Sequence, residues 1–441
     1  MKKSLLSEFA KYASLNVLGM IGISGYILAD TFFVSKALGP TGIAALNLAI
    51  SIFSILQGIG LLIGMGGSTR FSILKSQKED DKASIVFSTS IKLGLLISLI
   101  LFLVGLFGTR GLSLILGADS TTLPLTNTYL STILIFSPFF ILNNILLAFV
   151  RNDNKPKLSM IAMLIGSFSN IILDYLFLFP LGMGMFGAAF ATSLAPIISI
   201  CILLFPSIKR KNSFLLFLKN RIAWPLIPDI FKLGLSSFIA EVSSAVVLIT
   251  FNLVILRIEG NLGVAAYGIV ANLALIGTAL FTGLAQGMQP LASRYYGSNQ
   301  YPIAKKVWQY ALQTSISLAI IIYVGVYNYS ESIIDIFNSE SNIAMAQMAE
   351  TGLRIYFLGF LFVGTNIIAS QFLSSVERTR EAFIISISRG LIIIVPLVLI
   401  LSKIWNMKGV WVAFVLTELL VTILARYLSN ARKKLNKSVL N

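Results

Sequence analysis

Two carboxylates lie inside long apolar stretches of this sequence, where an isolated charge is costly. Asp30 lies in the first such stretch and Asp174 in the fifth. Asn170 precedes Asp174 by four residues, so a helix places both on one face. Thr192 follows the small residues of the segment 187–191, which allow helices to approach closely. These residues are the first candidates for chemistry within a membrane.

A charge at the centre of a bilayer costs about 2.5–3.5 kcal/mol on insertion scales, so buried carboxylates indicate function. Carboxylate, amide and hydroxyl oxygens form a hard ligand set that suits a proton or Na⁺. We predict a cation-coupling site, and we expect no other metal in it. Its members are Asp30, Asn170, Asp174 and Thr192. The alternative is that each Asp is hydrogen-bonded and purely structural.

Further polar residues within apolar stretches are candidates for a substrate cavity. They are Asn47, Gln57, Asn144, Glu241, Asn252, Gln286 and Asn366. Glu241 has no cationic neighbour in sequence and is the candidate for a second acidic group near that cavity. Arg389 and Glu418 lie on consecutive stretches at comparable depth, so we expect a structural ion pair, with a substrate role as the alternative. For Arg354, an alternative to a role in the cavity is contact with the outer headgroups.

The composition requires a membrane environment. Of 441 residues, 56% are hydrophobic and only 12% are charged, too few to cover the surface of a soluble protein. There is no histidine and the single cysteine is Cys201, which excludes His triads, disulfides and Cys or His metal clusters within one chain. We therefore expect a polytopic membrane protein that is not an enzyme and uses no cofactor. The net charge of +16 indicates contact with anionic lipid rather than nucleic acid.

A membrane span needs about 20 mostly apolar residues, and continuous rather than alternating runs indicate helices. We predict twelve transmembrane helices. They are 10–35, 43–69, 88–108, 126–150, 158–180, 186–206, 232–256, 264–290, 308–328, 350–375, 382–402 and 408–428. The first run is too long for a signal peptide and is expected to be retained.

The connections between these runs indicate orientation and lobes. Lys and Arg concentrate on one side, so both termini are expected to be cytoplasmic in the cell membrane. The longest basic connection separates six spans from six. We therefore predict an N-terminal lobe (1–206), a basic inter-lobe loop (207–231) and a C-terminal lobe (232–441) with a basic tail.

The two halves resemble each other at a nearly constant offset. The segment 39–45 matches 260–266 at an offset of 221, and Ala189-Phe190 matches Ala413-Phe414 at 224. Repeats with an even number of spans share one topology, so we expect two six-helix bundles related by a pseudo-twofold axis, a design typical of alternating access. The carboxylates are not repeated, because the offsets place Phe251 opposite Asp30 and Val398 opposite Asp174.

With these features the chain resembles the multidrug and toxic compound extrusion (MATE) family, and most closely the branch named for DNA-damage-inducible protein F. The resemblance rests on the order and spacing of segments 149–156, 170–174, 184–192, 286–290 and 409–411. It implies two six-helix bundles around a V-shaped cavity. It also implies antiport, in which organic cations and amphipathic drugs leave in exchange for H⁺ or Na⁺.

The resemblance also assigns residues. The acidic site of the family's N-terminal lobe matches the four residues Asp30, Asn170, Asp174 and Thr192. Glu241 resembles a seventh-span carboxylate of another branch, whose tenth-span acid is replaced here by Asn366. A monomer suffices, because the two halves are fused.

Two other classes of function remain as alternatives. A flippase for a lipid-linked oligosaccharide would need a cationic cavity for pyrophosphate, for which Arg354 and Arg389 are the candidates. A membrane-bound enzyme would need a metal cluster or a Gly-rich phosphate loop, and the sequence contains neither.

Overall fold

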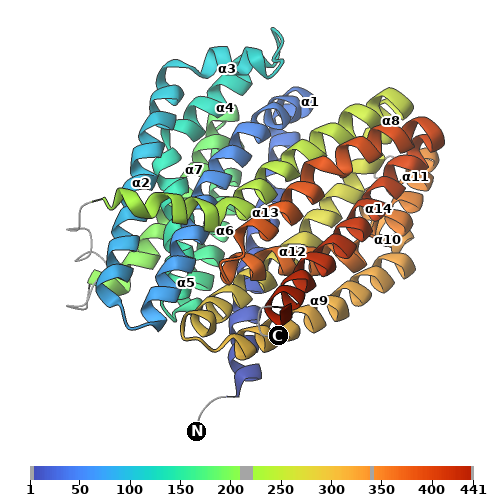
Figure 1. Cartoon of the computed structure of the whole chain (residues 1–441). Helices are drawn as coiled ribbons and strands as arrows, with labels where there is room; N and C mark the ends of the chain where they lie inside the picture. Colours follow the sequence, from blue (N-terminus) through green and yellow to red (C-terminus); the bar gives the residue numbers. More distant parts are fainter. Residues whose placement is uncertain (1–3, 209–221, 338–341, 439–441) are drawn as a thin grey trace. The chain divides into compact units, whose positions relative to one another are not determined.

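The computed structural model describes residues 4–208, 222–337 and 342–438, and within these ranges all regular structure is helical (Figure 1). Most of the expected inter-lobe loop, residues 209–221, lies outside the described residues. The longer helices are α1 (Leu5–Ser76), α2 (Asp80–Phe107), α4 (Leu123–Ile135), α5 (Ser137–Asn152), α6 (Pro156–Leu178), α7 (Gly184–Ile208), α8 (Ile227–Gly297), α9 (Tyr301–Asn328), α11 (Ile343–Tyr356), α12 (Phe360–Ser375) and α14 (Ile394–Ser438). Shorter elements are α3 (Thr109–Ile115), η2 (Trp224–Leu226), α10 (Ser330–Phe337), α13 (Thr379–Ile387) and the π-helical turn η3 (Ser388–Ile392).

These helices account for the expected spans. Seven continuous helical stretches among the described residues are long and apolar enough to cross a membrane, and two bent pairs, α4–α5 and α11–α12, each form one more span. Three of the seven stretches contain an interior break and so hold two spans each. The described part of the chain therefore confirms an all-α polytopic fold with twelve transmembrane helices.

The breaks in α1 and α8 have the same backbone geometry. Gly39 has φ 64° and ψ −158°, and Gly260 has φ 61° and ψ −153°. Only glycine adopts this region without strain, because any Cβ would meet the backbone. The two glycines are 221 residues apart, the offset of the sequence repeat. The same residue type thus ends the first span and starts the second in each half.

Other backbone features recur at the same spacing. Lys78 and Asn299 are 221 apart, Asn154 and Glu377 are 223 apart, and all four have φ between 59° and 64°. Each is followed by a residue whose N–H donates to a carbonyl five residues earlier, at 2.8–3.2 Å. This is the Schellman closure of a helix end. The bends of the two broken spans also correspond, at 52° between α4 and α5 and 49° between α11 and α12.

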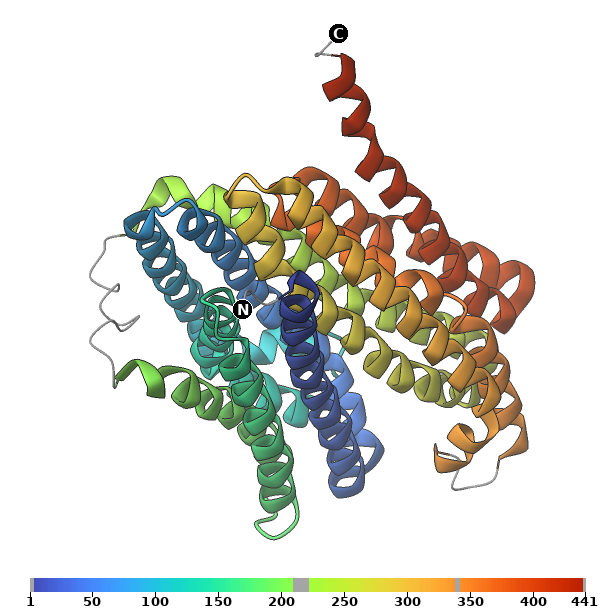
Figure 2. The ribbon, with the colours of Figure 1, turned by 90° about the horizontal axis from the view of Figure 1, so that it is seen from below.

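The chain forms two compact units. The N-terminal unit comprises Ser14–Val242 with Ser293–Tyr301, and the C-terminal unit comprises Met1–Ala13, Ser243–Ala292 and Pro302–Asn441. The long helices α1 and α8 contribute to both. The lobe boundaries expected from the sequence stay a prediction. Figure 2 shows α14 continuing past the other helices of its unit toward the C-terminus.

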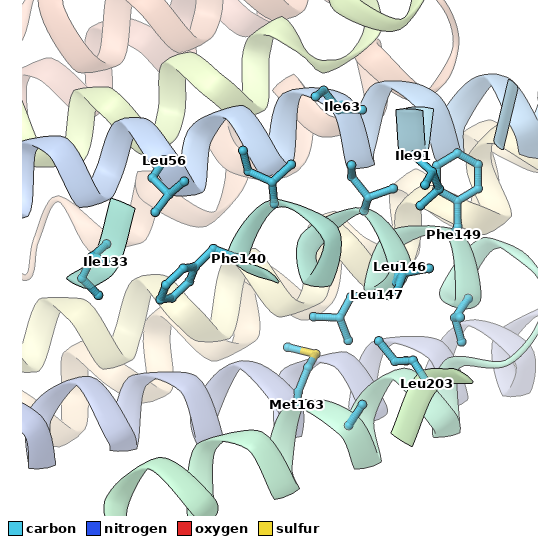
Figure 3. Close-up of a cluster of buried hydrophobic side chains, with 14 of the residues drawn as sticks. Leu56, Ile63, Ile91, Ile133, Phe140, Leu146, Leu147, Phe149, Met163 and Leu203 are labelled. Carbon is cyan, nitrogen blue, oxygen red and sulfur yellow. The ribbon is translucent and has the colours of Figure 1, made fainter. Parts of the chain in front are cut away.

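Each unit has its own apolar core. In the N-terminal unit, Ile63 of α1, Phe140 and Phe149 of α5 and Met163 of α6 are at most 5% exposed and belong to one cluster (Figure 3). Phe149 packs edge-on against Phe87 of α2, with ring centroids 5.0 Å apart. Close packing rather than the hydrophobic effect associates helices within lipid, and these interdigitated rings provide it.

The core of the C-terminal unit is richer in aromatic rings. Tyr356 of α11 stacks on Phe414 of α14 with centroids 3.8 Å apart, and Trp411 meets Tyr356 edge-on at 6.3 Å. Phe251 of α8 stacks on Tyr267 of the same helix at 5.5 Å. All five rings are less than 9% exposed.

The two glycine breaks generate a stability prediction. Replacing Gly39 or Gly260 with Ala is expected to lower the free energy of unfolding by about 1–3 kcal/mol, because Ala is strained at this φ and ψ even though no neighbouring atom lies within 4 Å of the added Cβ. Thermal unfolding of the purified protein in detergent measures the effect. Gly25→Ala and Gly268→Ala are matched controls, since those positions are equally open and have ordinary helical backbone. Equal midpoints for all four variants would contradict the assignment of strain to the breaks.

Candidate cation-coupling site

Three helices of the N-terminal unit supply the expected site. Asp30 lies on the first arm of α1, Asn170 and Asp174 lie one turn apart on α6, and Thr192 lies on α7. Ala188, Ala189 and Ala191 of α7 are 0% exposed. These small side chains let α6 and α7 pack closely, as the sequence pattern indicates.

The four side chains are buried. Asp174 and Asn170 are 0% exposed, Thr192 is 3% exposed and Asp30 is 7% exposed. The Asn170 amide is best oriented with its nitrogen donating to Asp174 Oδ2 at 3.0 Å and its oxygen accepting from the Thr192 backbone N–H at 3.2 Å. Asn170 therefore joins the carboxylate of α6 to the backbone of α7.

Neither carboxylate is compensated by a cation. No Lys or Arg of the described residues forms an ion pair with Asp30 or Asp174, and the Oδ1 atom of each has no hydrogen-bond partner there. The two groups are close enough for their charges to interact. Two neighbouring negative charges in an apolar interior are strongly unfavourable, so the pair is a candidate site for a proton or a cation.

Three further polar groups lie around the two carboxylates, and none of them was expected from the sequence. The Tyr129 hydroxyl on α4 is hydrogen-bonded with the Thr192 side chain, and the Tyr129 ring is 4% exposed. Tyr26 precedes Asp30 by one turn and interacts electrostatically with both carboxylates. Ser167 Oγ, one turn before Asn170, is buried without a partner among the described residues.

Helical spacing alone could have identified Tyr26 and Ser167. Residues 26 and 30 share one helix face, and residues 167, 170 and 174 share one face of another helix. Tyr129 had no such signal, since nothing in its own stretch distinguishes it from a tyrosine that faces lipid. Its role depends on how α4 packs against α7.

The expected cavity residues of the N-terminal unit fall into three environments. Glu241 is half-buried and interacts electrostatically with Tyr26, which connects it to the acidic pair. Asn144 Nδ2 donates to Gln57 Oε1 at 2.6 Å, so these two amides form one polar pair between α5 and α1. Asn47 is exposed near the Gly39 break.

The remaining candidates lie in the C-terminal unit. Asn252 and Gln286 are half-buried on α8. Asn366 differs from the expectation that it lines a cavity: it is 1% exposed, and its Nδ2 donates to Glu418 Oε2 at 2.7 Å and to the Glu418 carbonyl at 2.9 Å. Its Oδ1 accepts from Thr422 at 2.9 Å. The amide is thus fully engaged with its own unit.

Glu418 is the centre of that polar cluster. Arg389 Nε donates to Glu418 Oε1 at 2.6 Å, while Glu418 itself is 2% exposed. The ion pair that the sequence suggests is therefore present. Arg354 pairs with Glu350 one turn earlier, at 2.6 Å, and lies over the ring of Tyr327. Each of these arginines has a carboxylate neighbour, in contrast to the uncompensated aspartates of the N-terminal unit.

The positions that correspond to the aspartates in the repeat are apolar. Phe251 and Val398 are both 0% exposed and belong to the aromatic core of the C-terminal unit. Among the described residues, no group of three or more His, Cys, Asp or Glu side chains is placed to hold a metal ion. The acidic site therefore offers two carboxylates, one amide and hydroxyl oxygens.

The chain is similar to known multidrug exporters along its whole length. The multidrug export protein MepA of Staphylococcus saprophyticus is 27% identical over 448 residues, covering 100% of this chain and 97% of that protein. The protein of the same name from Staphylococcus aureus is 28% identical over 403 residues, covering 91% of this chain and 88% of that protein. The branch named for DNA-damage-inducible protein F stays a prediction.

Solved structures share the fold. An outward-facing multidrug resistance MATE family transporter of the MOP superfamily superposes with a TM-score of 0.92 at 20% identity, covering 99% of this chain and 98% of that chain. A MOP superfamily transporter from Pyrococcus furiosus superposes with a TM-score of 0.89 at 21% identity, covering 98% and 96%. At such identities the likeness establishes the fold alone.

The family follows from the sequence match itself. The family model MatE matches residues 17–176 and 237–400, which together make up more than half of the chain and include most of the spans in both halves. The chain belongs to the MatE family, and it is a multi-pass membrane transporter rather than an enzyme.

Proposed function

We propose that this transporter exports cationic and amphipathic organic compounds across the cell membrane in exchange for H⁺ or Na⁺. Membership of the MatE family supports export, and two relatives that match nearly the whole chain are named as multidrug exporters. The positive-inside pattern supports cytoplasmic termini, and a monomer suffices because both halves lie on one chain.

The observation that carries the proposal is the uncompensated acidic pair. Asp30 and Asp174 are buried, interact with one another and have no cationic partner among the described residues. A purely structural carboxylate in a membrane protein is normally paired, as Glu418 is with Arg389. An exchangeable ion supplies the missing positive charge.

Ion and substrate exclude each other in this mechanism. A proton or Na⁺ that enters the site neutralises Asp30 and Asp174 and removes the attraction for a cationic substrate. The Asn170 amide transmits the change to α7, because it contacts both Asp174 and the backbone of Thr192. Moving one charge through 100 mV is worth about 2.3 kcal/mol, which biases the equilibrium between the two orientations of the transporter.

The ligand set supports a monovalent ion. Two carboxylates, one amide and the hydroxyls of Thr192 and Tyr129 offer oxygen atoms of moderate total charge. Both H⁺ and Na⁺ accept such ligands. The proposal therefore includes either H⁺ or Na⁺ as the coupling ion.

The flippase alternative has less support. A diphosphate requires several uncompensated positive charges, whereas Arg354 is paired with Glu350 and Arg389 with Glu418. The acidic pair would also repel a pyrophosphate group. Export of cations is therefore the proposal that the charges of the described residues favour.

The first prediction concerns the carboxylates. Asp30→Asn and Asp174→Asn are each expected to reduce gradient-driven ethidium exchange in proteoliposomes at least about tenfold, because a neutral amide cannot be charged and discharged. Asp335→Asn is the matched control, since Asp335 is an exposed carboxylate of α10. Wild-type exchange by both site variants would mean that the acidic pair does not couple transport.

The second prediction concerns the ion. When Na⁺ and pH gradients are imposed separately on everted vesicles, one of them is expected to drive ethidium uptake by the wild-type protein. The same gradient should be ineffective with Asp174→Asn, because the ion's ligand is lost. Uptake that responds to neither gradient would rule out antiport with these ions.

A further inference from the structure

Arg389 occupies an irregular helical turn near the middle of its span. The π-helical turn η3 runs from Ser388 to Ile392, and the Ile393 N–H donates to the Ser388 carbonyl five residues earlier at 3.0 Å. Such turns in membrane helices are frequent at functional sites. Arg389 lies ten residues after Thr379, the first residue of α13, within a continuous helical stretch that is long and apolar enough to cross a membrane.

Only one of the three guanidinium nitrogens of Arg389 forms a hydrogen bond within the described residues. Its Nε donates to Glu418 Oε1, and neither terminal nitrogen has a hydrogen-bond partner among the described residues. The other Glu418 oxygen, Oε2, accepts from Asn366. Glu418 thus accepts one hydrogen bond at each oxygen and anchors one edge of the guanidinium, while the terminal nitrogens have no partner among the described residues.

The Arg389 side chain is partly accessible. It is 22% exposed although its partner Glu418 is 2% exposed. Unsatisfied N–H groups of a charged side chain are too costly to face hydrocarbon, so charged residues inside spans face the protein interior or an aqueous space. We therefore expect the terminal nitrogens of Arg389 to face water or a ligand rather than lipid.

The turn that carries Arg389 packs tightly against its neighbours. Gly390 lies so close to α8 that a Cβ there would come within 2.1 Å of Ser243. Tyr356, 5% exposed and stacked on Phe414, interacts electrostatically with both Arg389 and Glu418. The guanidinium is planar and its Nε is already bonded to Glu418, so less conformational entropy is lost when its other edge binds a ligand.

We propose that Arg389 binds the carboxylate of an amphipathic substrate through its two terminal nitrogens, so that the transporter recognises zwitterionic as well as cationic compounds. This inference rests on the proposed export function and adds a substrate group to it. The planar guanidinium fork matches a carboxylate with two parallel hydrogen bonds. Glu418 keeps the arginine in position between transport cycles.

Other anions fit the site less well. A lipid phosphate lies at the membrane surface, whereas Arg389 lies within an apolar stretch that can cross the membrane. A halide ion makes no use of the fork geometry, and the nearby charge of Glu418 opposes a small anion that brings no other contacts. A carboxylate attached to an apolar body gains contacts with the aromatic residues of the same unit.

Binding to matched ligands tests the proposal. An aromatic amine that carries a carboxylate and its methyl ester differ only in the group that Arg389 would recognise. Fluorescence titration of the purified full-length protein is expected to give about tenfold tighter binding of the acid than of the ester. In Arg389→Gln this ratio should fall to about one. In Arg389→Lys, which keeps the charge but lacks the fork, the ratio should be intermediate.

The controls separate binding from folding. Arg389→Gln leaves Glu418 buried without its cation, so the double variant Arg389→Gln/Glu418→Gln, a neutral pair of similar volume, is measured as well. Arg354→Gln is the matched control and should keep the wild-type ratio, since that arginine pairs on α11 with Glu350. Thermal unfolding confirms that each variant is folded.

Each outcome decides the question. The proposal is supported if the preference for the acid over the ester is lost in Arg389→Gln and in the double variant but is kept in Arg354→Gln. The proposal is overturned if the folded double variant keeps the wild-type preference for the acid. It is also overturned if the wild-type protein binds acid and ester equally and chloride competes with both. Failure of the export proposal is distinguishable, because it would appear as absent gradient-driven uptake while the binding ratio persisted.

Discussion

A carboxylate inside a membrane is stable only when something compensates its charge, and the structure of the N-terminal unit is organised around two carboxylates that lack permanent compensation. Asp30 and Asp174 are buried, near one another, and each keeps one oxygen without a partner among the described residues. The Asn170 amide joins Asp174 to α7, and the small residues of α7 let that helix pack closely against α6. Because the free energy of the pair depends on an added proton or cation, its occupancy can set the conformation of the helices that carry it.

The two units share one backbone arrangement but differ in their buried charges. Breaks, helix ends and bends recur at offsets of 221–223 residues, so the helical framework has been kept. The side chains have diverged. Where the N-terminal unit has Asp30 and Asp174, the C-terminal unit has Phe251 and Val398. Its own buried carboxylate, Glu418, is neutralised by Arg389, accepts a hydrogen bond from Asn366 and needs no exchangeable ion. Under the proposed mechanism, ion exchange takes place in the N-terminal unit.

Much of this could be predicted from the sequence, because the bilayer imposes strong local constraints. Apolar length fixes the spans, and the cost of buried charge marks Asp30 and Asp174 without any knowledge of packing. The pairing of Arg389 with Glu418 followed from consecutive spans at similar depth. Contacts between non-adjacent helices could not be obtained in this way. The hydrogen bond between Tyr129 and Thr192, and the engagement of Asn366 by Glu418, depend on how α4 meets α7 and how α12 meets α14. The π-helical turn at Arg389 could not be predicted, because nothing in the residues 388–392 distinguishes them from an ordinary helical segment.

The central claim is that substrate and coupling ion compete for the negative charge of Asp30 and Asp174. The most direct measurement is the dissociation constant of ethidium for the purified protein, determined by fluorescence anisotropy across separate series of pH and Na⁺ concentration. The account predicts that binding weakens as the coupling ion is raised, and that this dependence disappears in the double variant Asp30→Asn/Asp174→Asn. A dissociation constant of the wild-type protein that is independent of both ions would contradict it.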